Sequence, residues 1–164
     1  MAVDPSKAVG SFLVPVDGTE ASYSALAVVC DVARQTKARV NALHVIEVPR
    51  SLPLESDMPD AALRGERILE RAEAVGEEHK VTVEADLLQA RQAGHAVVDE
   101  AVDRGVDAIV VGLDYHRPYG RFELGRLPQY VMEHSPAQVW LLRYPAEEPR
   151  DGRDRTAPSG AADG

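Results

Sequence analysis

The chain has 164 residues and a net charge of −9, because 27 acidic residues outnumber 18 basic ones. Hydrophobic residues make up 45% of it and charged residues 27%, which is typical of a globular protein and not of a disordered one. The acidic balance excludes general nucleic-acid binding, which needs a basic surface, and docking on anionic membranes. A small anionic ligand is still compatible, because one local group of basic residues can bind a phosphate.

The apolar segments and the N-terminus indicate where the protein resides. The longest apolar runs, such as 25–30, fall far short of the eighteen or so residues of a membrane span. Residues 1–9 lack the apolar segment of a secretory signal. We therefore expect a cytoplasmic protein with no membrane insertion. The single cysteine, Cys30, excludes an internal disulfide, and its apolar surroundings predict a buried, unreactive thiol.

The chain divides into three parts by composition. Residues 145–164 are rich in Pro, Gly, Ala and charges and contain no Leu, Ile, Val, Phe, Tyr or Trp. Such a segment buries too little apolar area to offset the entropy of ordering it, so we expect a disordered tail. Residues 1–9 form a short leader, and the folded domain is expected over 10–144.

Short apolar segments alternate with longer amphipathic ones along this domain. Thr19 and Asp60 are candidate N-caps of the first two helices, and Gly105 is expected just beyond the end of the third. In chain order, the pattern predicts a strand at 11–16, a helix at 20–36, a strand at 39–48, a helix at 61–79, a strand at 81–88, a helix at 94–104, a strand at 106–111, a helix at 125–134 and a strand at 138–144.

Strands separated by helices predict a single-domain, doubly wound α/β fold. The five strands are expected to form one parallel, Rossmann-like sheet with helices on both faces. The β-branched run at 108–111 is typical of an interior strand that is covered on both sides. Ligands bind such sheets at the carboxyl ends of the strands, where the strand order reverses. The segments to examine are therefore 17–19, the region near Val48, 90–94 and 112–126.

Asp17 follows the first strand directly, in the sequence PVDGT. A carboxylate at this position can accept hydrogen bonds from an exocyclic amine or a ribose hydroxyl of a ligand. It can equally form an Asp-Gly turn and cap the following helix. The residues alone leave both interpretations open.

The loop over 112–126 (GLDYHRPYGRFELGR) has a local excess of basic residues in an otherwise acidic chain. It contains Arg117, Arg121 and Arg126, and it leads to a helix N-terminus, whose free N–H groups and dipole favour an anion. The sequence thus predicts an anion-binding loop. The alternative is a solvated loop whose charges form weak surface ion pairs.

The end of the domain resembles the universal stress protein family, in which a strand is followed by a loop G-x2-G-x9-G-[ST], a helix and a last strand. Gly112 and Gly125 match the first and last glycines of that loop in register. Upstream, 14–19 (VPVDGT) and 43–46 (LHVI) resemble the family's first two strands. The resemblance covers about residues 10–144 and implies the adenine nucleotide alpha hydrolase-like form of the Rossmann-like fold.

Family members with the complete loop bind ATP or another adenine nucleotide. The resemblance therefore implies ATP, AMP or a related adenine nucleotide as the ligand, although no cofactor follows from the residues themselves. By matching position it assigns Gly112 and Gly125 to the binding loop. It also assigns Asp17 and the backbone of Val45 to the adenine side of the ligand.

Two positions depart from the family's loop. Tyr115 stands in place of the second glycine, which lets the backbone approach a phosphate, and we expect it to bring bulk into that space. Arg126 replaces the Ser or Thr that offers a hydroxyl, and its guanidinium suits a phosphate or a carboxylate. Either the nucleotide site is lost, or it is adapted to a different anion.

Several enzyme classes are excluded by their missing motifs. The chain contains no G-x-x-x-x-G-K-[ST] loop, no G-x-G-x-x-G after the first strand and no G-x-S-x-G elbow. Its five histidines lack metal-ligand spacing, and we expect no metal site and no catalytic residues. We thus expect a non-enzymatic stress-response or signalling protein with a modified nucleotide or anion pocket. The alternative is a homodimeric interaction or adaptor module that has lost nucleotide binding, and nucleotide hydrolysis or transfer is a third hypothesis.

The last strand, 138–144 (QVWLLRY), is apolar and is expected at a sheet edge, where it needs to be covered. The family pairs this strand with its two-fold mate, so the resemblance implies a homodimer. The interface is expected to involve Val139, Trp140, Leu141 and Leu142.

Overall fold

The computed structural model describes residues 8–145, in which five strands and four helices alternate. The leader at 1–9 and the tail at 145–164 thus lie almost entirely outside the described residues. In order, the elements are β1 (Ser11–Pro15), α1 (Glu20–Thr36), β2 (Arg39–Glu47), α2 (Pro59–Glu78), β3 (Val83–Ala90), α3 (Ala93–Arg104), β4 (Ala108–Asp114), α4 (Arg126–His134) and β5 (Gln138–Tyr144).

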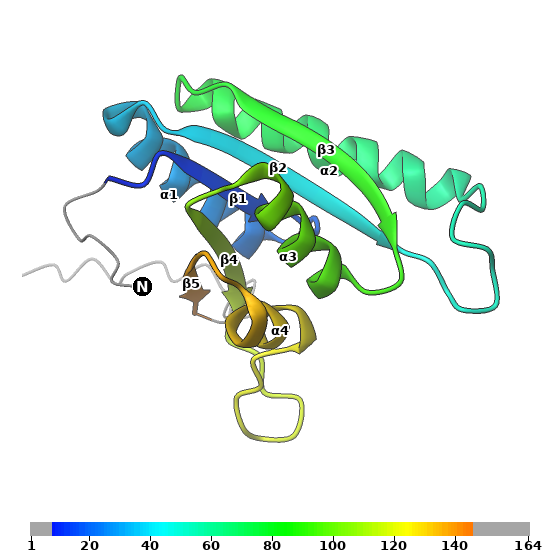
Figure 1. Ribbon diagram of the computed structural model, residues 1–164. Helices are drawn as coiled ribbons and strands as arrows, with labels where there is room; N and C mark the ends of the chain where they lie inside the picture. The colour runs from blue at the N-terminus through cyan, green and yellow to red at the C-terminus, as the bar shows by residue number, and fades with distance from the viewer. Residues whose placement is uncertain (1–7, 146–164) are drawn as a thin grey trace, which may run out of the picture.

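The five strands form one parallel sheet in the order β3-β2-β1-β4-β5 (Figure 1). β2 and β3 follow β1 on one side of the sheet, and β4 and β5 lie on its other side. The order therefore reverses between β1 and β4, which pair side by side. This is the predicted doubly wound, Rossmann-like α/β fold.

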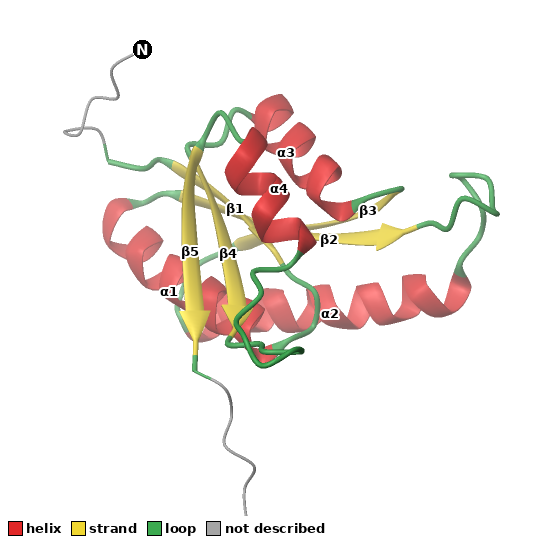
Figure 2. Ribbon diagram, turned by 90° about the horizontal axis from the view of Figure 1, so that it is seen from below, coloured by secondary structure: helices red, strands yellow, loops and turns green. Residues whose placement is uncertain are grey.

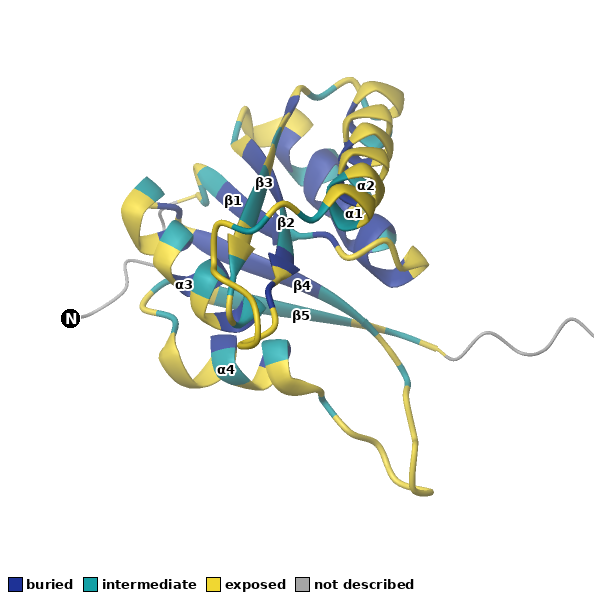
Figure 3. Ribbon diagram, turned by 90° about the vertical axis from the view of Figure 1, so that its right-hand side faces the viewer, coloured by how far each residue is buried: buried dark blue, intermediate teal, exposed yellow. Residues whose placement is uncertain are grey.

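Helices cover both faces of the sheet and enclose two hydrophobic cores. The core that includes Phe12, Val14 and Leu26 lies under α1 and α2. The other core, with Leu13 and Val131, lies under α3 and α4. Figure 3 shows the buried residues concentrated in the strands and on the inner sides of the helices.

The strands on either side of the reversal point are the most deeply buried. Phe12, Leu13 and Val14 of β1 are fully buried, as are Ala108 and Ile109 of β4. Because β4 lies between β1 and β5 and is covered on both faces, the interior position predicted from its β-branched run is confirmed. These two buried strands therefore support the residues that follow their carboxyl ends.

The helix boundaries agree with the expected caps in two cases out of three. The hydroxyl oxygen of Thr19 accepts a hydrogen bond from the N–H of Ser22 at 3.3 Å, and Gly105 ends α3 in a left-handed conformation. Asp60 does not cap α2, because that helix begins earlier, at Pro59. The fixed φ of proline suits the first turn of a helix, where its missing N–H has no partner to lose.

Two strands extend further than the sequence pattern predicts. β3 runs on to Ala90, because it stays paired with β2 as far as Glu47. β4 runs through Gly112 to Asp114, opposite Tyr144 of β5. Backbone pairing with a neighbouring strand thus keeps in the sheet five residues, 89–90 and 112–114, that the sequence pattern placed beyond the strand ends.

β5 lies at the edge of the sheet, as predicted. Its side chains alternate between the two cores: Trp140 and Leu142 pack on the α1 side, and Val139 and Leu141 on the α3 side. The ring of Trp140 meets Phe12 edge-on, with centroids 5.1 Å apart. These side chains are half-buried within their own chain, so a partner strand would meet chiefly the free backbone edge of β5.

Cys30 is fully buried in the core under α1. Burial raises the pKa of its thiol to about 11, which keeps it protonated and unreactive as expected. No helix within residues 8–145 is both long and apolar enough to cross a membrane.

A polar cluster joins the last turns of α1 to the end of α2. The Nδ1 atom of His79 lies 2.8 Å from Oδ1 of Asp31, and Nη2 of Arg34 lies 3.2 Å from the same oxygen. Arg34 also donates to the carbonyl of His79 at 3.0 Å. The hydrogen bond from His79, with the charges of both neighbours, holds the pKa of Asp31 below its ordinary value of 3.8.

We expect Asp31→Asn to lower the melting temperature at pH 5 to 7, because it removes the charge that His79 and Arg34 share. The lowered pKa means that the carboxylate stabilises the fold above about pH 4 and loses this effect as the pH falls through the folded-state value. The difference from wild type should therefore close below about pH 4 in thermal unfolding. Asp99→Asn, at an exposed α3 carboxylate with no ion pair in the described part of the chain, is the control; a difference that persists at low pH would contradict this account.

Candidate functional site

A cleft of about 500 Å³ lies at the carboxyl edge of the sheet, where the strand order reverses. Its walls are the ends of β1, β2 and β4, the first turn of α1, and parts of α3 and α4. Figure 2 shows the loop after β4 beside the tip of that strand, from which it leads to the start of α4. The volume is within the range of about 300–1,000 Å³ that small-molecule sites occupy.

Asp17 lines the cleft and also forms the turn between β1 and α1. Its Oδ1 atom accepts hydrogen bonds from the N–H of Thr19 at 3.0 Å and from the Thr19 hydroxyl at 2.6 Å. The turn that the sequence left open is therefore observed, but the residue that caps α1 is Thr19 and not Asp17. The second carboxylate oxygen makes no hydrogen bond to a described residue, so a contact to a ligand remains compatible with the turn.

His44 and Val45, at the end of β2, form the opposite wall. Nδ1 of His44 lies 2.7 Å from the carbonyl oxygen of Val16. Because that oxygen can only accept, Nδ1 must carry the proton, which leaves Nε2 as the acceptor in the neutral ring. This hydrogen bond holds the imidazole in one orientation at the wall of the cleft.

Gly112 contributes to the cleft by letting β4 and α1 come close together. A Cβ built at this position would lie 2.2 Å from the carbonyl oxygen of Ala21 and 2.7 Å from the Cβ of Ala25. No side chain fits there without displacing the backbone of α1. The glycine is thus required for the packing of α1 onto β4.

Gly125 precedes α4 and adopts φ +91°, which an L side chain rarely adopts. It brings the chain into the helix at the wall of the cleft, so that the first N–H groups of α4 face that region. Pro128, in the same turn, is buried and has no N–H to offer. The helix therefore presents the backbone donors of only Arg126 and Leu127 in its first three positions.

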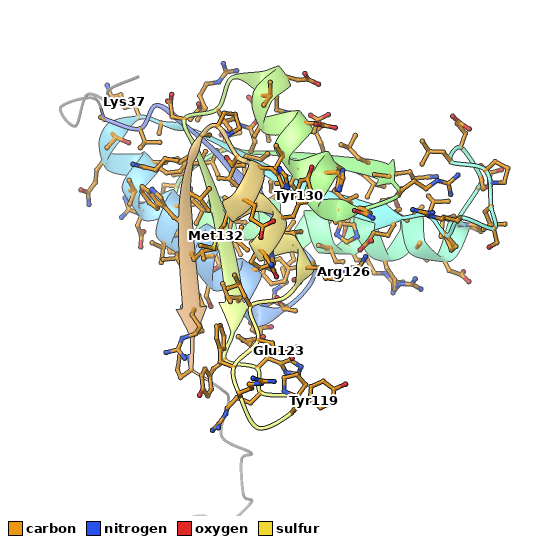
Figure 4. All side chains as sticks on the ribbon, turned by 60° about the horizontal axis from the view of Figure 1, so that its bottom comes forward. Lys37, Tyr119, Glu123, Arg126, Tyr130 and Met132 are labelled. Atoms are coloured by element: carbon orange, nitrogen blue, oxygen red, sulfur yellow. The ribbon has the colours of Figure 1, made fainter. Side chains whose placement is uncertain are left out.

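Residues 115–124, which we call the arm, project from the sheet and fold back on themselves. The N–H of Glu123 donates to the carbonyl of His116 at 3.1 Å, and that of Tyr115 donates to Tyr144 at the end of β5. Figure 4 shows Tyr119 towards the tip of the arm and Glu123 closer to the sheet. The arm is thus held as an extension of the β4–β5 pair.

An aromatic stack stabilises the arm. The ring of Tyr115 lies parallel to that of Phe122, with centroids 5.6 Å apart. The guanidinium of Arg143, on β5, lies 4.6 Å from the centroid of Tyr115 and 5.7 Å from that of Phe122. Contacts of this kind contribute about 0.5–1.5 kcal/mol each. Tyr115 therefore packs beside the cleft and not within it.

Arg126 begins α4 and lines a second groove of about 290 Å³ between α3 and α4. Glu47, Glu133 and Tyr130 also line this groove, which adjoins the cleft and shares Glu47, Ala93 and Leu127 with it. His95 of α3 stacks on Tyr130 with centroids 4.0 Å apart. Figure 4 shows Arg126 at the start of α4 and Tyr130 further along the same helix.

The structure thus divides the eight predicted binding residues into two groups. Four line the cleft together: Asp17, Val45, Gly112 and Gly125. The other four, Tyr115, Arg117, Arg121 and Arg126, lie in the arm or in the neighbouring groove. Arg117 donates to the carbonyl of Gly120 within the arm.

Sequence reasoning missed most of the polar side chains that line the cleft. Glu47, Asp114 and Glu123 are among them, with His44 and His116. Asp114, His116 and Glu123 fall within 112–126, the segment after β4 that the rule on strand ends selects. Glu47 lies next to Val48, which marks a second selected segment. Their positions after strand ends were therefore a usable signal, but the excess of arginines in the loop favoured an interpretation based on basic residues.

Comparison with known proteins places the chain among proteins of the same architecture. The universal stress protein family model matches residues 9–143. A universal stress protein of Methanocaldococcus jannaschii is 25% identical over 142 residues, which is 83% of each chain. The universal stress protein from Archaeoglobus fulgidus in complex with dAMP superposes with a TM-score of 0.65 and 16% identity, over 80% of this chain and 95% of that one.

A universal stress protein family protein of Arabidopsis thaliana with AMP bound superposes with a TM-score of 0.61 and 19% identity, over 86% of this chain and 97% of that one. Together, the sheet order and the cleft at its reversal point define an open α/β domain of the Rossmann-like class. Within that class, the chain belongs to the universal stress protein family.

We expect Gly112→Ala to destabilise the fold by about 1–3 kcal/mol or more, because its methyl group overlaps the carbonyl of Ala21. Denaturant unfolding measures this loss. Adding Ala25→Gly removes one of the two contacts but leaves the backbone contact in place, so the double variant should recover only a minor part. Full recovery would show that the backbone approach at Ala21 is not the limiting contact.

Proposed function

We propose that this protein is a non-enzymatic, stress-response member of its family that binds an adenine nucleotide in the cleft and acts through association as a homodimer. The observation that carries the proposal is the cleft at the reversal point, with Asp17, Val45 and Gly125 on its walls. Relatives of the same fold are known with AMP and with dAMP. The ligand would change how the protein associates and would itself stay unchanged.

The lining residues support binding over chemical turnover. The hydroxyl of Ser22 donates to the carbonyl of Thr19 at 2.8 Å, and Nδ1 of His44 donates to a backbone carbonyl. The Ser22 hydroxyl and the His44 imidazole thus do not form a hydrogen-bonded pair of nucleophile and general base. Within residues 8–145, no three His, Cys, Asp or Glu side chains are grouped so as to hold a metal ion.

The second candidate function is an interaction module without a nucleotide. It is favoured by the stack of Tyr115, Phe122 and Arg143, which holds the loop as a projecting arm. In this arrangement neither Arg117 nor Arg121 lines the cleft. Titration with nucleotides separates the two functions directly.

Gly125→Ala is expected to weaken AMP binding at least tenfold, because an alanine strains the φ of +91° and shifts the start of α4 away from the ligand. Gly120→Ala is the matched control, since its φ of +78° is strained in the same way but no atom of the cleft lies near it. Calorimetric titration of both variants and wild type with AMP measures the effect. Absence of AMP binding to wild type would favour the interaction module.

The proposed homodimer forms through the free edge of β5. A β-rich edge strand with unpaired N–H and C=O groups is an aggregation hazard unless another strand covers it. Pairing with a second copy satisfies these groups and gives a closed two-fold interface.

Leu141→Pro and Leu142→Pro test this edge, because successive residues of a strand direct their N–H groups to opposite sides. The proline that replaces a residue whose N–H points towards β4 breaks the hydrogen-bond ladder to that strand and should lower the melting temperature. The other removes a donor from the free edge, and it should dissociate the dimer while the fold stays intact. Sedimentation at tens of micromolar (an assumed working concentration) compares them with wild type; a monomeric wild type, or a dimer that survives both changes, would contradict the proposal.

A further inference from the structure

The lining of the cleft is acidic. Four carboxylates, those of Asp17, Glu47, Asp114 and Glu123, line it, and none of the lining residues is Lys or Arg. None of the four forms an ion pair with any residue from 8 to 145, so their charges are not neutralised within the described fold. A cleft whose walls carry charges of one sign concentrates their electric field at the position of a ligand.

Asp114 and Glu123 belong to the segment between Gly112 and Gly125, and both line the cleft. Asp114 is the last residue of β4, directly before Tyr115 at the second motif position. Glu123 is held at the base of the arm by its N–H, which donates to the carbonyl of His116. Both positions follow from strand pairing and the folded-back arm, and neither depends on a long unsupported loop.

Three arginines near the cleft are not among its lining residues. Arg143 lies over the rings of Tyr115 and Phe122, and Arg117 donates to the carbonyl of Gly120. Arg126 lines the neighbouring groove with Glu47 and Glu133. A ligand in the cleft thus meets four lining carboxylates and no lining Lys or Arg, whereas a polyphosphate is bound by cations or backbone donors.

We infer that the cleft selects adenine ligands by their phosphate number, preferring the nucleoside and the monophosphate to ATP, and that Asp114 and Glu123 set this preference. The inference rests on the proposed adenine-nucleotide function and specifies its ligand class. Each added phosphate brings further negative charge towards these two carboxylates, whereas the adenine and ribose are uncharged. Repulsion of this kind favours the ligand with the fewest phosphates.

The experiment titrates wild type and Asp114→Asn/Glu123→Gln with adenosine, AMP and ATP by calorimetry, in metal-free buffer at low salt. The readout is the ratio of ATP affinity to adenosine affinity, which a uniform loosening of the cleft does not change. We expect wild type to bind ATP at least tenfold more weakly than adenosine or AMP. The double variant should raise the ratio about 3- to 30-fold.

Two controls separate local charge from other causes. Asp99→Asn/Asp103→Asn makes the same change in net charge at exposed positions of α3 outside the cleft, and it should leave the ratio within about twofold of wild type. Raising the salt to about 0.5 M should narrow the wild-type preference, because screening acts on charges and not on shape.

The outcomes that overturn the inference are distinct from those that overturn the proposed function. Binding of ATP as tightly as AMP refutes the selectivity but leaves the nucleotide function in place. A ratio unaltered by the double variant, equally altered by the α3 control, or insensitive to salt refutes the role of Asp114 and Glu123. If wild type and the double variant bind none of the three ligands, the proposed function fails, and the selectivity fails with it.

Discussion

The contact on which the site depends is the close approach of β4 to α1 at Gly112. A strand and a helix can lie this near only where a side chain is missing, since the carbonyl of Ala21 occupies the place of a Cβ. The approach brings the end of β4 beside the turn of Asp17 and Thr19, and both then border one cleft. A larger residue at position 112 would push β4 and α1 apart, and the walls of the cleft would move apart as well.

The arm shows how one aromatic residue changes the use of a loop. Tyr115 stacks on Phe122 and binds the guanidinium of Arg143, and its N–H continues the ladder to β5. These interactions order the segment as an extension of the sheet. A glycine at the same position has no ring to stack and more conformations to lose, which favours a loop that shapes itself around a ligand.

The fold was predictable from the sequence because its determinants are local or periodic. Apolar runs located the five strands, Thr19 and Gly105 marked helix ends, and the composition of β5 indicated an edge. The resemblance in register assigned Gly112 and Gly125 to one binding loop, and both residues line the cleft.

The directions of the long polar side chains were not predictable in this way. Arg126 occupies the groove beside Tyr130 because of how α3 packs against α4, and Tyr115 turns outward because Arg143 lies on the adjacent strand. Both depend on partners distant in sequence or on a neighbouring element. Likewise, the last residues of β4 belong to the sheet only because β5, which follows later in the chain, pairs with them.

The pairing of β1 with β4 also determines when the cleft comes into existence during synthesis. The contact between Ser11 and Asp107 at this seam joins residues 96 positions apart, whereas β1, β2 and β3 follow one another along the chain. During synthesis β1, β2 and β3 therefore emerge before β4, and the edge of β1 that faces β4 is paired only after β4 has been made. A ligand of the cleft can stabilise only the completed sheet, so it acts on the last step of assembly and not on the nascent half.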